Sequence, residues 1–368
     1  MLARIMWLNK KLARVLAACV VLGAVAPAQA SFLTNGNFVP LVTAGAPPDS
    51  PDAHIDLNVP ASAFSGVVSI NIRFNDQSYI CSGALVGRRQ VISAGHCVDV
   101  TGTGTVIDIN APGNDVRVVF NDGVADSVIT ASAVSIHPDY EGFGNCPLGV
   151  NAFCLNDDLS VITLGEDAPA SAKIYKVAVN KLLSGTRITM AGYGTSGDGV
   201  NGFTVGPDFR IKRTGDNHVD LFDGDDEQGF GGPREVWYAD FDGAGQDTFC
   251  DFFGACSPQL ANNRESGIGG GDSGGPSFVS MYGELMIVAS NTFGGWFDGQ
   301  QPGTFGTYFG GNVLGSYKDY LFDATDGTIA LVPEPAGVAL FGLGLLALLG
   351  ARRCKRKAAT RCASPPSA

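Results

Sequence analysis

Gly271-Asp272-Ser273-Gly274-Gly275-Pro276 is the stretch around which the rest of this sequence is organised. A nucleophilic hydroxyl must stand clear of its backbone, and the oxyanion of a tetrahedral intermediate needs main-chain N–H donors nearby, so the glycines around Ser273 have a chemical use. The alternative is an ordinary Gly-rich turn, which is common in a chain with 50 glycines. A serine hydroxyl reacts only when a base takes its proton. The first interpretation therefore requires a histidine and a buried carboxylate elsewhere in the chain.

The composition describes an acidic globular protein. The chain has 368 residues, enough for one large or two ordinary domains, and 45% hydrophobic with 16% charged residues is typical of a folded protein. Ten of the 24 basic residues and one of the 36 acidic residues lie in residues 1–30 and 334–368. The part between them has 14 basic and 35 acidic residues, a net charge of −21. Such a charge repels phosphate backbones, so nucleic acid is not expected as a partner.

Residues 1–30 have the features of a signal peptide. Four basic residues come before an apolar run over 15–26, and Ala28-Gln29-Ala30 supplies the small residues of a cleavage site. A membrane-spanning anchor is the alternative, but the run is short for one. A lipoprotein signal at Cys19 also fits the local pattern, although little apolar sequence separates Cys19 from Arg14. We expect cleavage after Ala30, and all of these interpretations imply export.

Export changes how the nine cysteines are interpreted. Cys19 leaves with the signal, and Cys354 and Cys362 lie in the basic tail. An even number of six remains, which in an exported chain favours disulfides over metal ligation. Six cysteines allow 15 pairings, of which we expect the three between sequence neighbours. A Cys/His zinc site is the alternative, but the spacings are not those of a zinc module. The expected pairs are Cys81 with Cys97, Cys146 with Cys154, and Cys250 with Cys256.

The body of the chain has an all-β pattern. Residues 31–60 hold five prolines among small and polar residues and are predicted to be a linker or propeptide rather than a packed element. From Val67 to Phe74 apolar and polar side chains alternate, and short runs of this kind recur to about residue 320 with Gly, Asn and Asp between them. No long stretch keeps helical periodicity. We therefore expect a β-sandwich or β-barrel over residues 61–328.

The base that Ser273 requires is supplied by the segment Ser93-Ala94-Gly95-His96-Cys97. His96 directly follows a predicted strand and stands beside a cysteine whose expected partner, Cys81, would fasten it in place. A lone histidine is more often an ordinary surface or core residue. The strand–loop setting favours a catalytic element here.

These stretches together resemble a chymotrypsin/trypsin-family serine endopeptidase. The histidine, aspartate and serine segments occur in the family's order, and the resemblance covers roughly residues 60–325. It implies that Ser273 attacks the scissile carbonyl, that His96 takes and returns the proton, and that Asp158 fixes the histidine tautomer. The N–H groups of Gly271 and Ser273 would form the oxyanion hole. The other matching segments are Ile136-His137-Pro138-Asp139-Tyr140, Asp158-Leu159-Ser160-Val161-Ile162 and Ala191-Gly192-Tyr193-Gly194.

The resemblance also implies a fold of two packed antiparallel six-stranded β-barrels with the active site between them. His96 and Asp158 would come from the first barrel and Ser273 from the second. Asp157 is the alternative to Asp158, because the two carboxylates are adjacent and strand alternation sends them to opposite sides. For His137 the favoured role is structural.

Three features differ from the family pattern. Zymogens of this family are commonly activated when a new apolar N-terminus pairs with the aspartate before the nucleophile, but the upstream region has only His54-Ile55-Asp56-Leu57 as a weak equivalent. Gly267 stands where the family sets the charge of the specificity pocket, and Gly269 replaces a common cysteine. Ser290 and Thr292 are expected to lie on the strand that pairs with substrate, with Thr292 narrowing the pocket toward small apolar side chains.

The acidic run Asp220-Leu221-Phe222-Asp223-Gly224-Asp225-Asp226-Glu227 could supply carboxylate oxygens to calcium. Its spacing is not that of an EF-hand, and a solvated acidic loop is the favoured interpretation. We therefore expect no metal and no cofactor, and we expect chelators to leave activity unchanged.

Residues 329–368 have the pattern of a sorting signal. Val332-Pro333-Glu334-Pro335 leads into a Gly/Leu-rich apolar run over 336–351 and then a basic cluster over 352–357. A buried helix is the alternative, but the charge cluster favours a transmembrane helix with a cytoplasmic basic flank. The three parts resemble a PEP-CTERM signal, which implies processing by an exosortase-type enzyme in a Gram-negative bacterium. The precursor would be anchored transiently in the inner membrane and the mature protein secreted or held at the cell surface.

The expected function is that of an exported serine endopeptidase acting on protein or peptide substrates through an acyl-enzyme intermediate. A catalytically silent relative that binds proteins or polysaccharide is the main alternative, and a structural surface protein is a third. The complete triad with an intact Gly-Asp-Ser-Gly-Gly favours the enzyme.

Overall fold

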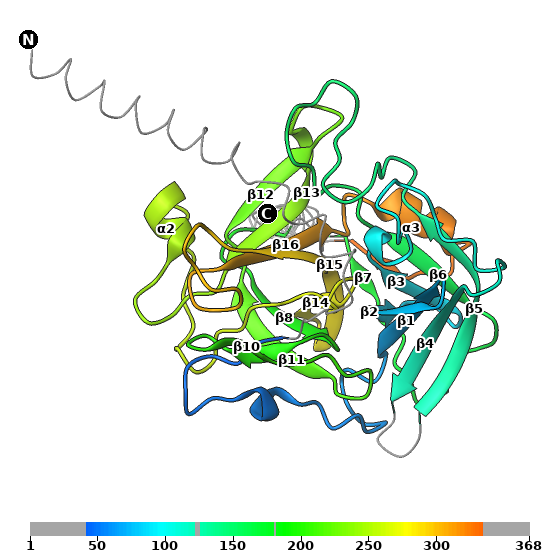
Figure 1. Ribbon diagram of the computed structural model, residues 1–368, viewed down its shortest axis with the longest axis horizontal. Coiled ribbons are helices and arrows are strands. Elements are labelled where there is room, and N and C mark those ends of the chain that lie inside the picture. Colours follow the sequence, from blue (N-terminus) through cyan, green and yellow to red (C-terminus); the bar gives the residue numbers. More distant parts are fainter. Residues whose placement is uncertain (1–41, 122–125, 180–181, 334–368) are drawn as a thin grey trace, which may run out of the picture. The chain divides into compact units, whose positions relative to one another are not determined.

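The computed structural model describes residues 42–121, 126–179 and 182–333. The chain divides into a unit that ends at Leu331 and a second unit that begins at Val332. Almost all of the second unit lies outside the described residues, as do the predicted signal peptide and the apolar run over 336–351. Only the first unit is described below (Figure 1).

The first half of this unit is a closed antiparallel barrel of six strands in the order β1-β2-β3-β6-β5-β4. These segments form strands of a barrel because every second side chain is apolar and faces the barrel interior. In β1, Ile70 and Ile72 are buried with Val116 and Val118 of the neighbouring strand. The first barrel of the expected fold is thus confirmed. Its strands are β1 (Val67–Phe74), β2 (Gln77–Leu85), β3 (Gln90–Ser93), β4 (Asp115–Asn121), β5 (Asp126–Ile136) and β6 (Ser160–Leu164).

The second half is a nine-stranded sheet rather than the six-stranded barrel that the resemblance implies. Over the described residues its main path runs β11-β8-β14-β15-β16-β13-β12, and β11 and β12 do not pair with each other. β7 joins the sheet beside β15 and itself pairs with β17. The strands are β7 (Val177–Ala178), β8 (Arg187–Gly192), β11 (Arg213–His218), β12 (Leu221–Asp225), β13 (Gly231–Asp240), β14 (Pro276–Met281), β15 (Glu284–Gly295), β16 (Tyr308–Val313) and β17 (Leu331–Val332).

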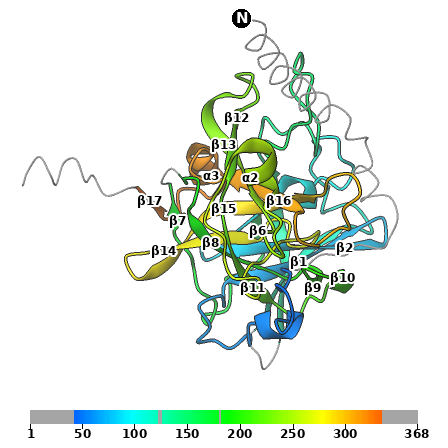
Figure 2. The same cartoon turned by 90° about the vertical axis from the view of Figure 1, so that its left-hand side faces the viewer.

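The sequence between β8 and β14 accounts for much of this difference. It contributes the small separate sheet of β9 (Ser196–Asp198) and β10 (Gly202–Val205), and the long hairpin of β12 and β13. Two register shifts interrupt the β12–β13 pairing, around Gly224. Bulges of this kind increase local twist and bend a strand away from a regular sheet. The hairpin therefore extends the sheet instead of closing it (Figures 1 and 2).

Among residues 42–121, 126–179 and 182–333, helices are few and short. The 3₁₀ turns are η2 (Pro51–His54) and η3 (Gly95–Cys97), and the α-helices are α2 (Thr248–Phe253) and α3 (Lys318–Ala324). Asp247 caps α2 by accepting a hydrogen bond from Cys250 N, and Gly254 ends it in the left-handed conformation. Over the described residues, no helix is long and apolar enough to cross a membrane.

The segment from Val42 to His54 packs against the second sheet, although residues 31–60 were expected not to form a packed element. Val42, Thr43 and Ala44 are fully buried. Ala44 bridges to Asp198 in parallel, and the chain then passes along β11 through η2 (blue in Figures 1 and 2). Prolines prevented a strand interpretation of this segment, but they do not prevent a short extended piece from pairing at a sheet edge.

All three predicted disulfides are present. Cys81 bonds Cys97, Cys146 bonds Cys154, and Cys250 bonds Cys256. The first fastens η3, which carries His96, to β2. The other two close short loops, one before Asp158 and one at the end of α2.

Candidate active site

His96 is held in place by Asp158 through two hydrogen bonds. The backbone N–H of His96 donates to Asp158 Oδ1 at 2.7 Å, and the ring Nδ1 lies 2.7 Å from Asp158 Oδ2. The Asp158 side chain is 1% exposed and the His96 side chain 15%. A buried carboxylate in this position selects the tautomer with the proton on Nδ1, which leaves Nε2 able to accept a proton.

Asp157, the alternative carboxylate, faces elsewhere. Its Oδ1 lies 3.1 Å from Nδ1 of His137, and its N–H donates to the Tyr317 hydroxyl. The His137 ring packs edge-on against Tyr317 and Tyr320, next to the start of α3. The structure thus contains two His–Asp pairs side by side, and only the pair formed by Asp158 includes His96.

The backbone around Ser273 is bound to the elements that carry His96. Ser82, beside the disulfide cysteine of β2, donates its N–H to Ser273 O at 2.8 Å and its hydroxyl to Gly271 O at 2.6 Å. The Sγ of Cys97 lies 3.7 Å from Ser273 O. The residue that follows His96 therefore touches the residue expected to be the nucleophile, although the two are 176 positions apart.

The glycine after Ser273 allows this close approach. Gly274 has φ +79°, and a Cβ atom there would clash with Ser93 Oγ and lie 2.6 Å from Ala94 N. Both neighbours belong to the segment that leads into His96. A side chain at this position would push the Ser273 segment away from the histidine.

The reactive groups themselves are unengaged in this structure. Among the described residues, none forms a hydrogen bond with the Ser273 hydroxyl, and His96 Nε2 is not bonded to it. In ligand-free enzymes such contacts are often long and tighten only when substrate binds. Within the same described part of the chain, the N–H groups of Gly271 and Ser273 also donate to no acceptor. Buried N–H groups are usually paired, so these two are available to a ligand.

Asp272 is completely buried beneath this loop. Gly194 N and Gly269 N donate to its two oxygens at 3.2 and 3.3 Å. A Cβ atom at Gly192 would clash with the carboxylate, so a glycine is required there. Burial raises the pKa of Asp272 to about 7, although the two amides and the charge of Arg213 act in the opposite direction.

The residues expected to contact substrate lie around one region of the second sheet. Two hydrogen bonds join Gly267 to Thr43. Thr43 N donates to Gly267 O, and Gly267 N donates to Thr43 Oγ1. Ser290 and Thr292 lie on β15, where the pairing with β16 shifts register between Asn291 and Phe293. Both hydroxyls are buried without a hydrogen-bond partner.

Sequence reasoning missed Phe143, which covers one face of His96. The two rings lie 5.1 Å apart in an edge-on arrangement, and Phe153 packs on the other side of Phe143. The Cys146–Cys154 disulfide closes the loop that holds Phe153, and Phe143 lies three residues before that loop. The position of this cysteine pair just before Asp158 was the only sequence signal for such a cover.

Other predicted features lie apart from His96. In the weak activation segment, His54 binds Asp49 and Thr214 O, and Ile55 bridges to Arg213. The acidic run is not the solvated loop that was expected, because three of its carboxylates are buried as β12 pairs with β13. These are Asp220, Asp225 and Asp226, at 4%, 9% and 2% exposure.

Three groups of side chains among the described residues have the composition of a metal site. His96 lies with Cys81 and Cys97, but both sulfurs are in the disulfide and are not available as ligands. Two further groups are entirely acidic and lie on the second half of the chain. Neither includes His96, Asp158 or Ser273.

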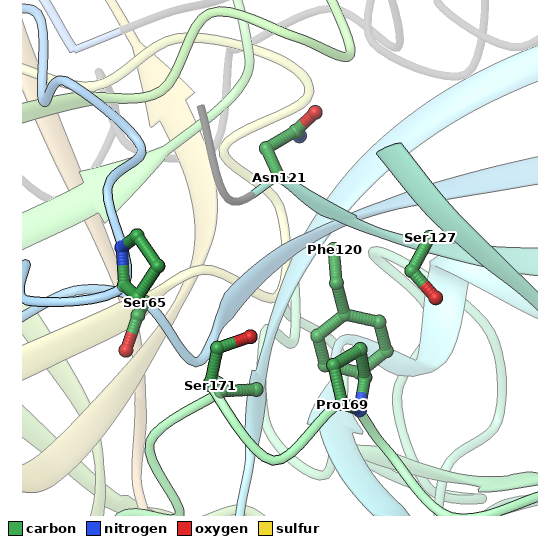
Figure 3. Close-up of a pocket in the computed structure, with 8 residues that line it drawn as sticks. Ser65, Phe120, Asn121, Ser127, Pro169 and Ser171 are labelled. Atoms are coloured by element: carbon green, nitrogen blue, oxygen red, sulfur yellow. The ribbon is translucent and has the colours of Figure 1, made fainter. Parts of the chain in front are cut away.

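A small pocket of about 120 Å³ opens elsewhere, at the edge of the first barrel (Figure 3). Phe120 and Asn121 of β4 and Ser127 of β5 line it, opposite Pro169 and Ser171 of the loop after β6. No predicted site residue contributes to this pocket, and it has no charged group among its lining residues.

Comparison with known proteins identifies two segments. Residues 58–205 match the trypsin family model, and residues 331–356 match the PEP-CTERM protein-sorting motif. Brachyurin from Leptuca pugilator is 25% identical over 133 residues, which is 36% of this chain and 52% of that protein. This chain thus matches about half the length of its curated relative. The chain carries a trypsin-family domain and a PEP-CTERM motif, which confirms the resemblance inferred from the sequence. His96 and Asp158 lie inside the trypsin match and Ser273 outside it.

Proposed function

We propose that this protein is a serine endopeptidase. The observation that carries the proposal is the pairing of His96 with a fully buried Asp158, at a site to which β2 binds the backbone of Ser273. The trypsin-family match and the similarity to brachyurin, a serine protease, support the same conclusion.

In the proposed reaction, the Ser273 oxygen attacks the scissile carbonyl while His96 Nε2 takes its proton. His96 then gives this proton to the leaving amine as the C–N bond breaks, leaving an acyl-enzyme. Water then attacks the acyl carbonyl and gives a proton to His96. The bond between the acyl carbon and the Ser273 oxygen breaks, His96 returns the proton to that oxygen, and the acid leaves. Asp158 stays ionised throughout and stabilises the imidazolium, because its negative charge lies 2.7 Å from Nδ1.

The N–H groups of Gly271 and Ser273 serve as the proposed oxyanion hole. Both lack an acceptor among the described residues, so binding an oxyanion breaks no hydrogen bond that the structure contains. Donors fixed before the reaction need no reorganisation when charge develops, and removal of one such donor costs about 3 kcal/mol.

The proposed specificity is for uncharged side chains. Gly267 brings no charge to the position where the family places one, and Phe241 lies close to it, with ring carbons 3.4 Å from where a Cβ would be. A preference for Lys or Arg would need a carboxylate there. Ser290 and Thr292 are proposed to line the same pocket from β15.

Activation is proposed to follow cleavage before Val42. The new N-terminus would then be Val42, and not one in the segment His54-Ile55-Asp56-Leu57. Val42 O accepts a hydrogen bond from Ser196, and Thr43 binds Gly267. These contacts lie two residues from Gly194 and Gly269, the donors to Asp272. A new amino group at Val42 would lie near this carboxylate and could form with it the ion pair that no described residue forms, since Arg213 acts on Asp272 only from a distance. N-terminal sequencing of the active form tests this, since an active chain that retains residues before Val42 would exclude it.

Export and sorting are proposed from the ends of the chain. The PEP-CTERM match over 331–356 supports recognition by an exosortase-type enzyme. A signal peptide over 1–30 and a transient membrane helix over 336–351 complete the proposal. The proposed propeptide is residues 31–41 instead of the expected 31–60, and the protease domain runs from Val42 to residue 328. Fractionation of cells that express the full chain tests it, and accumulation of uncleaved protein in the cytoplasm would exclude export.

A catalytically silent binding protein is the alternative. Pre-steady-state hydrolysis of a chromogenic ester separates the two, because an acyl-enzyme mechanism gives a burst of one product per active site. We expect this burst from the processed protein and its loss in Ser273→Ala. The matched control is Ser277→Ala, four residues further along the same segment. Absence of a burst in the processed, disulfide-bonded protein would support the binding function.

A further inference from the structure

Five carboxylates gather at the end of β13, behind the predicted specificity pocket. Asp240 ends β13, Asp242 follows it, and Asp247 caps α2. One carboxylate oxygen from each of these three lies within 4.8 Å of the others. Asp220 accepts the N–H of Asp240, and Glu265 stands two residues before Gly267. Segments from four parts of the chain therefore bring negative charge to one place.

Most of these carboxylates are removed from water. Asp240 and Glu265 are fully buried, and Asp220 and Asp242 are each 4% exposed. Among the ion pairs of the described residues, none involves any of the five. An isolated buried carboxylate is costly unless it is paired or binds a metal ion. A cluster of them adds like-charge repulsion to that cost.

Hydrogen bonds fix one oxygen of Asp240 and one of Glu265 and leave the other oxygen of each unpartnered, whereas both oxygens of Asp247 accept a hydrogen bond. Asp240 Oδ2 accepts from Phe249 N at 2.7 Å, and Glu265 Oε2 accepts from Leu260 N at 2.7 Å. In contrast, Asp240 Oδ1, Asp242 Oδ1 and Glu265 Oε1 are buried with no hydrogen-bond partner. Buried polar atoms are nearly always satisfied. Three unsatisfied oxygens in one acidic cluster indicate a missing electropositive ligand.

The electrostatics agree with this geometry. Burial raises the pKa of Asp242 to about 9, and the neighbouring charges of Asp240, Asp247 and Glu265 add to the effect. A bound cation would reverse that balance by favouring the ionised carboxylates.

We propose that Asp240, Asp242 and Asp247 bind a Ca²⁺ ion, with Glu265 and Asp220 adding negative charge around it. The donor set is entirely oxygen, which suits a hard cation and not zinc or copper. Two oxygens bound to one Ca²⁺ can lie up to about 5 Å apart, twice the Ca–O distance. The three convergent oxygens meet this condition. The ion would join the end of β13 to the start of α2 and to the segment that leads into Gly267.

This proposal replaces the expectation of a metal-free protein and locates the site away from most of the acidic run that suggested calcium. Asp225, Asp226, Glu227 and Glu235 form a second acidic group at the β12–β13 hairpin. In that group one oxygen, Asp226 Oδ1, is buried without a partner, and Glu227 is exposed. The cluster around Asp242 is therefore the stronger candidate.

Calcium binding to the full chain, stripped with EGTA and dialysed, tests the proposal directly. Calorimetric titration with CaCl₂ should reveal binding, and saturating Ca²⁺ should raise the melting temperature by roughly 5–10 °C relative to EGTA. Asp242→Asn should bind one ion fewer and lose most of this rise. In EGTA the same variant should melt higher than the wild type, because the substitution removes like-charge repulsion.

Two further variants locate the site. Asp251→Asn removes an exposed carboxylate of α2 only four residues from Asp247, and it should keep the full shift. Asp226→Asn, in the second acidic group, should keep it as well. If Asp242→Asn fails to fold, Asp247→Asn at the partly exposed rim replaces it. The proposal is overturned if the wild type binds no Ca²⁺, or if binding survives Asp242→Asn and is lost in Asp226→Asn.

Discussion

Asp157 and Asp158 are adjacent in the chain, yet each binds a different histidine. Both lie in the bend just before β6, where Asp157 has a positive φ of 60°, and their side chains leave the backbone in different directions. Asp158 reaches His96 and Asp157 reaches His137. Two chemically identical groups thus acquire different proposed roles, one in the proton transfer and one in holding α3 against the first barrel.

This arrangement predicts opposite outcomes for one substitution at neighbouring positions. Asp158→Asn should lower kcat by about 10⁴-fold, because an amide favours the wrong His96 tautomer. Asp157→Asn should leave kcat within a few-fold and lower stability instead, because asparagine tolerates a positive φ but removes the carboxylate that lies 3.1 Å from His137 Nδ1. Ester hydrolysis and urea denaturation of both variants measure this. Comparable losses of kcat in the two variants would contradict the assignment.

Gly274 and Gly283 provide a second matched pair. Both have φ +79°, but a Cβ at Gly274 would clash with Ser93, whereas a Cβ at Gly283 would meet open space. Gly283→Ala should therefore cost only about 1–2 kcal/mol of backbone strain. Gly274→Ala should cost more and should also reduce activity, because it displaces Ser273 from His96. Equal stability losses with unchanged activity in both variants would show that the close approach at Gly274 is unimportant.

The individual residues of the candidate site were predicted from local patterns in the sequence. Ser273 stood out among its glycines and His96 beside its cysteine, and Asp158 was preferred to Asp157 because it stands directly before an apolar strand, as in the family pattern. Phe143 and Thr43 were not identified, because their contacts with His96 and Gly267 depend on how distant loops pack. No local pattern encodes such a contact.

Among the elements, the Cys81–Cys97 disulfide has the most direct link to the site. It joins β2 to η3 across 16 residues, and β2 in turn binds the Ser273 backbone. The Cys250–Cys256 bond closes 6 residues beside α2 and touches no proposed catalytic residue. Removing each bond in turn therefore distinguishes an effect on stability alone from an effect on activity.

Replacing both cysteines of a pair by alanine should reduce stability in each case. The loss should be about 3 kcal/mol for the Cys81–Cys97 pair and about 2 kcal/mol for the shorter Cys250–Cys256 loop, as loop-closure entropy predicts. Only the first double variant should also lose kcat/KM at a temperature where both are folded. Unchanged kcat/KM in that variant would contradict the role given to η3 and β2.

Element prediction succeeded where alternation was regular and failed where glycines weakened it. The strands of the first barrel were visible as alternating runs. The run 220–227, which contains β12, was instead interpreted as a solvated acidic loop, because Asp and Gly dominate it. Its pairing with β13 is irregular, with register shifts around Gly224. Burial of its carboxylates results from pairing and packing that the sequence pattern does not reveal.

For the whole molecule, the segment from Val42 connects processing to the site. It packs at full burial beside the donors of Asp272, whose pKa burial raises to about 7. An acid whose pKa is higher in the folded than in the unfolded state makes the protein less stable as pH rises between these values. The unfolded pKa of an aspartate is about 3.9.

The unprocessed chain should therefore lose stability between about pH 4 and pH 7 through Asp272, by about 4 kcal/mol at most. Other carboxylates also titrate in this range, so the measured quantity is the difference in unfolding free energy between wild type and Asp272→Asn. As pH rises, the wild type should become less stable relative to Asp272→Asn. A chain that begins at Val42 should not show the shift, since its amino group pairs with Asp272. A flat difference in the unprocessed chain would contradict the burial argument.

The packing of this N-terminal segment could not be predicted from its composition. Five prolines over 31–60 indicated a linker, and the contact of Thr43 with Gly267 spans 224 positions. The nine-stranded second sheet was missed for a related reason, since the resemblance implied only the six strands of a barrel. From the sequence alone, the insertions in this chain look like longer loops, because nothing local shows that their strands pair.

The central claim is that Ser273 is made reactive by His96 and Asp158, and its most direct test is covalent labelling. The processed, disulfide-bonded protein is treated with a fluorophosphonate probe at neutral pH, digested, and mapped by mass spectrometry. We expect one modification, on Ser273, that disappears in His96→Ala and slows strongly in Asp158→Asn. Absence of label on Ser273, or labelling that is unaffected by loss of His96, would contradict the account.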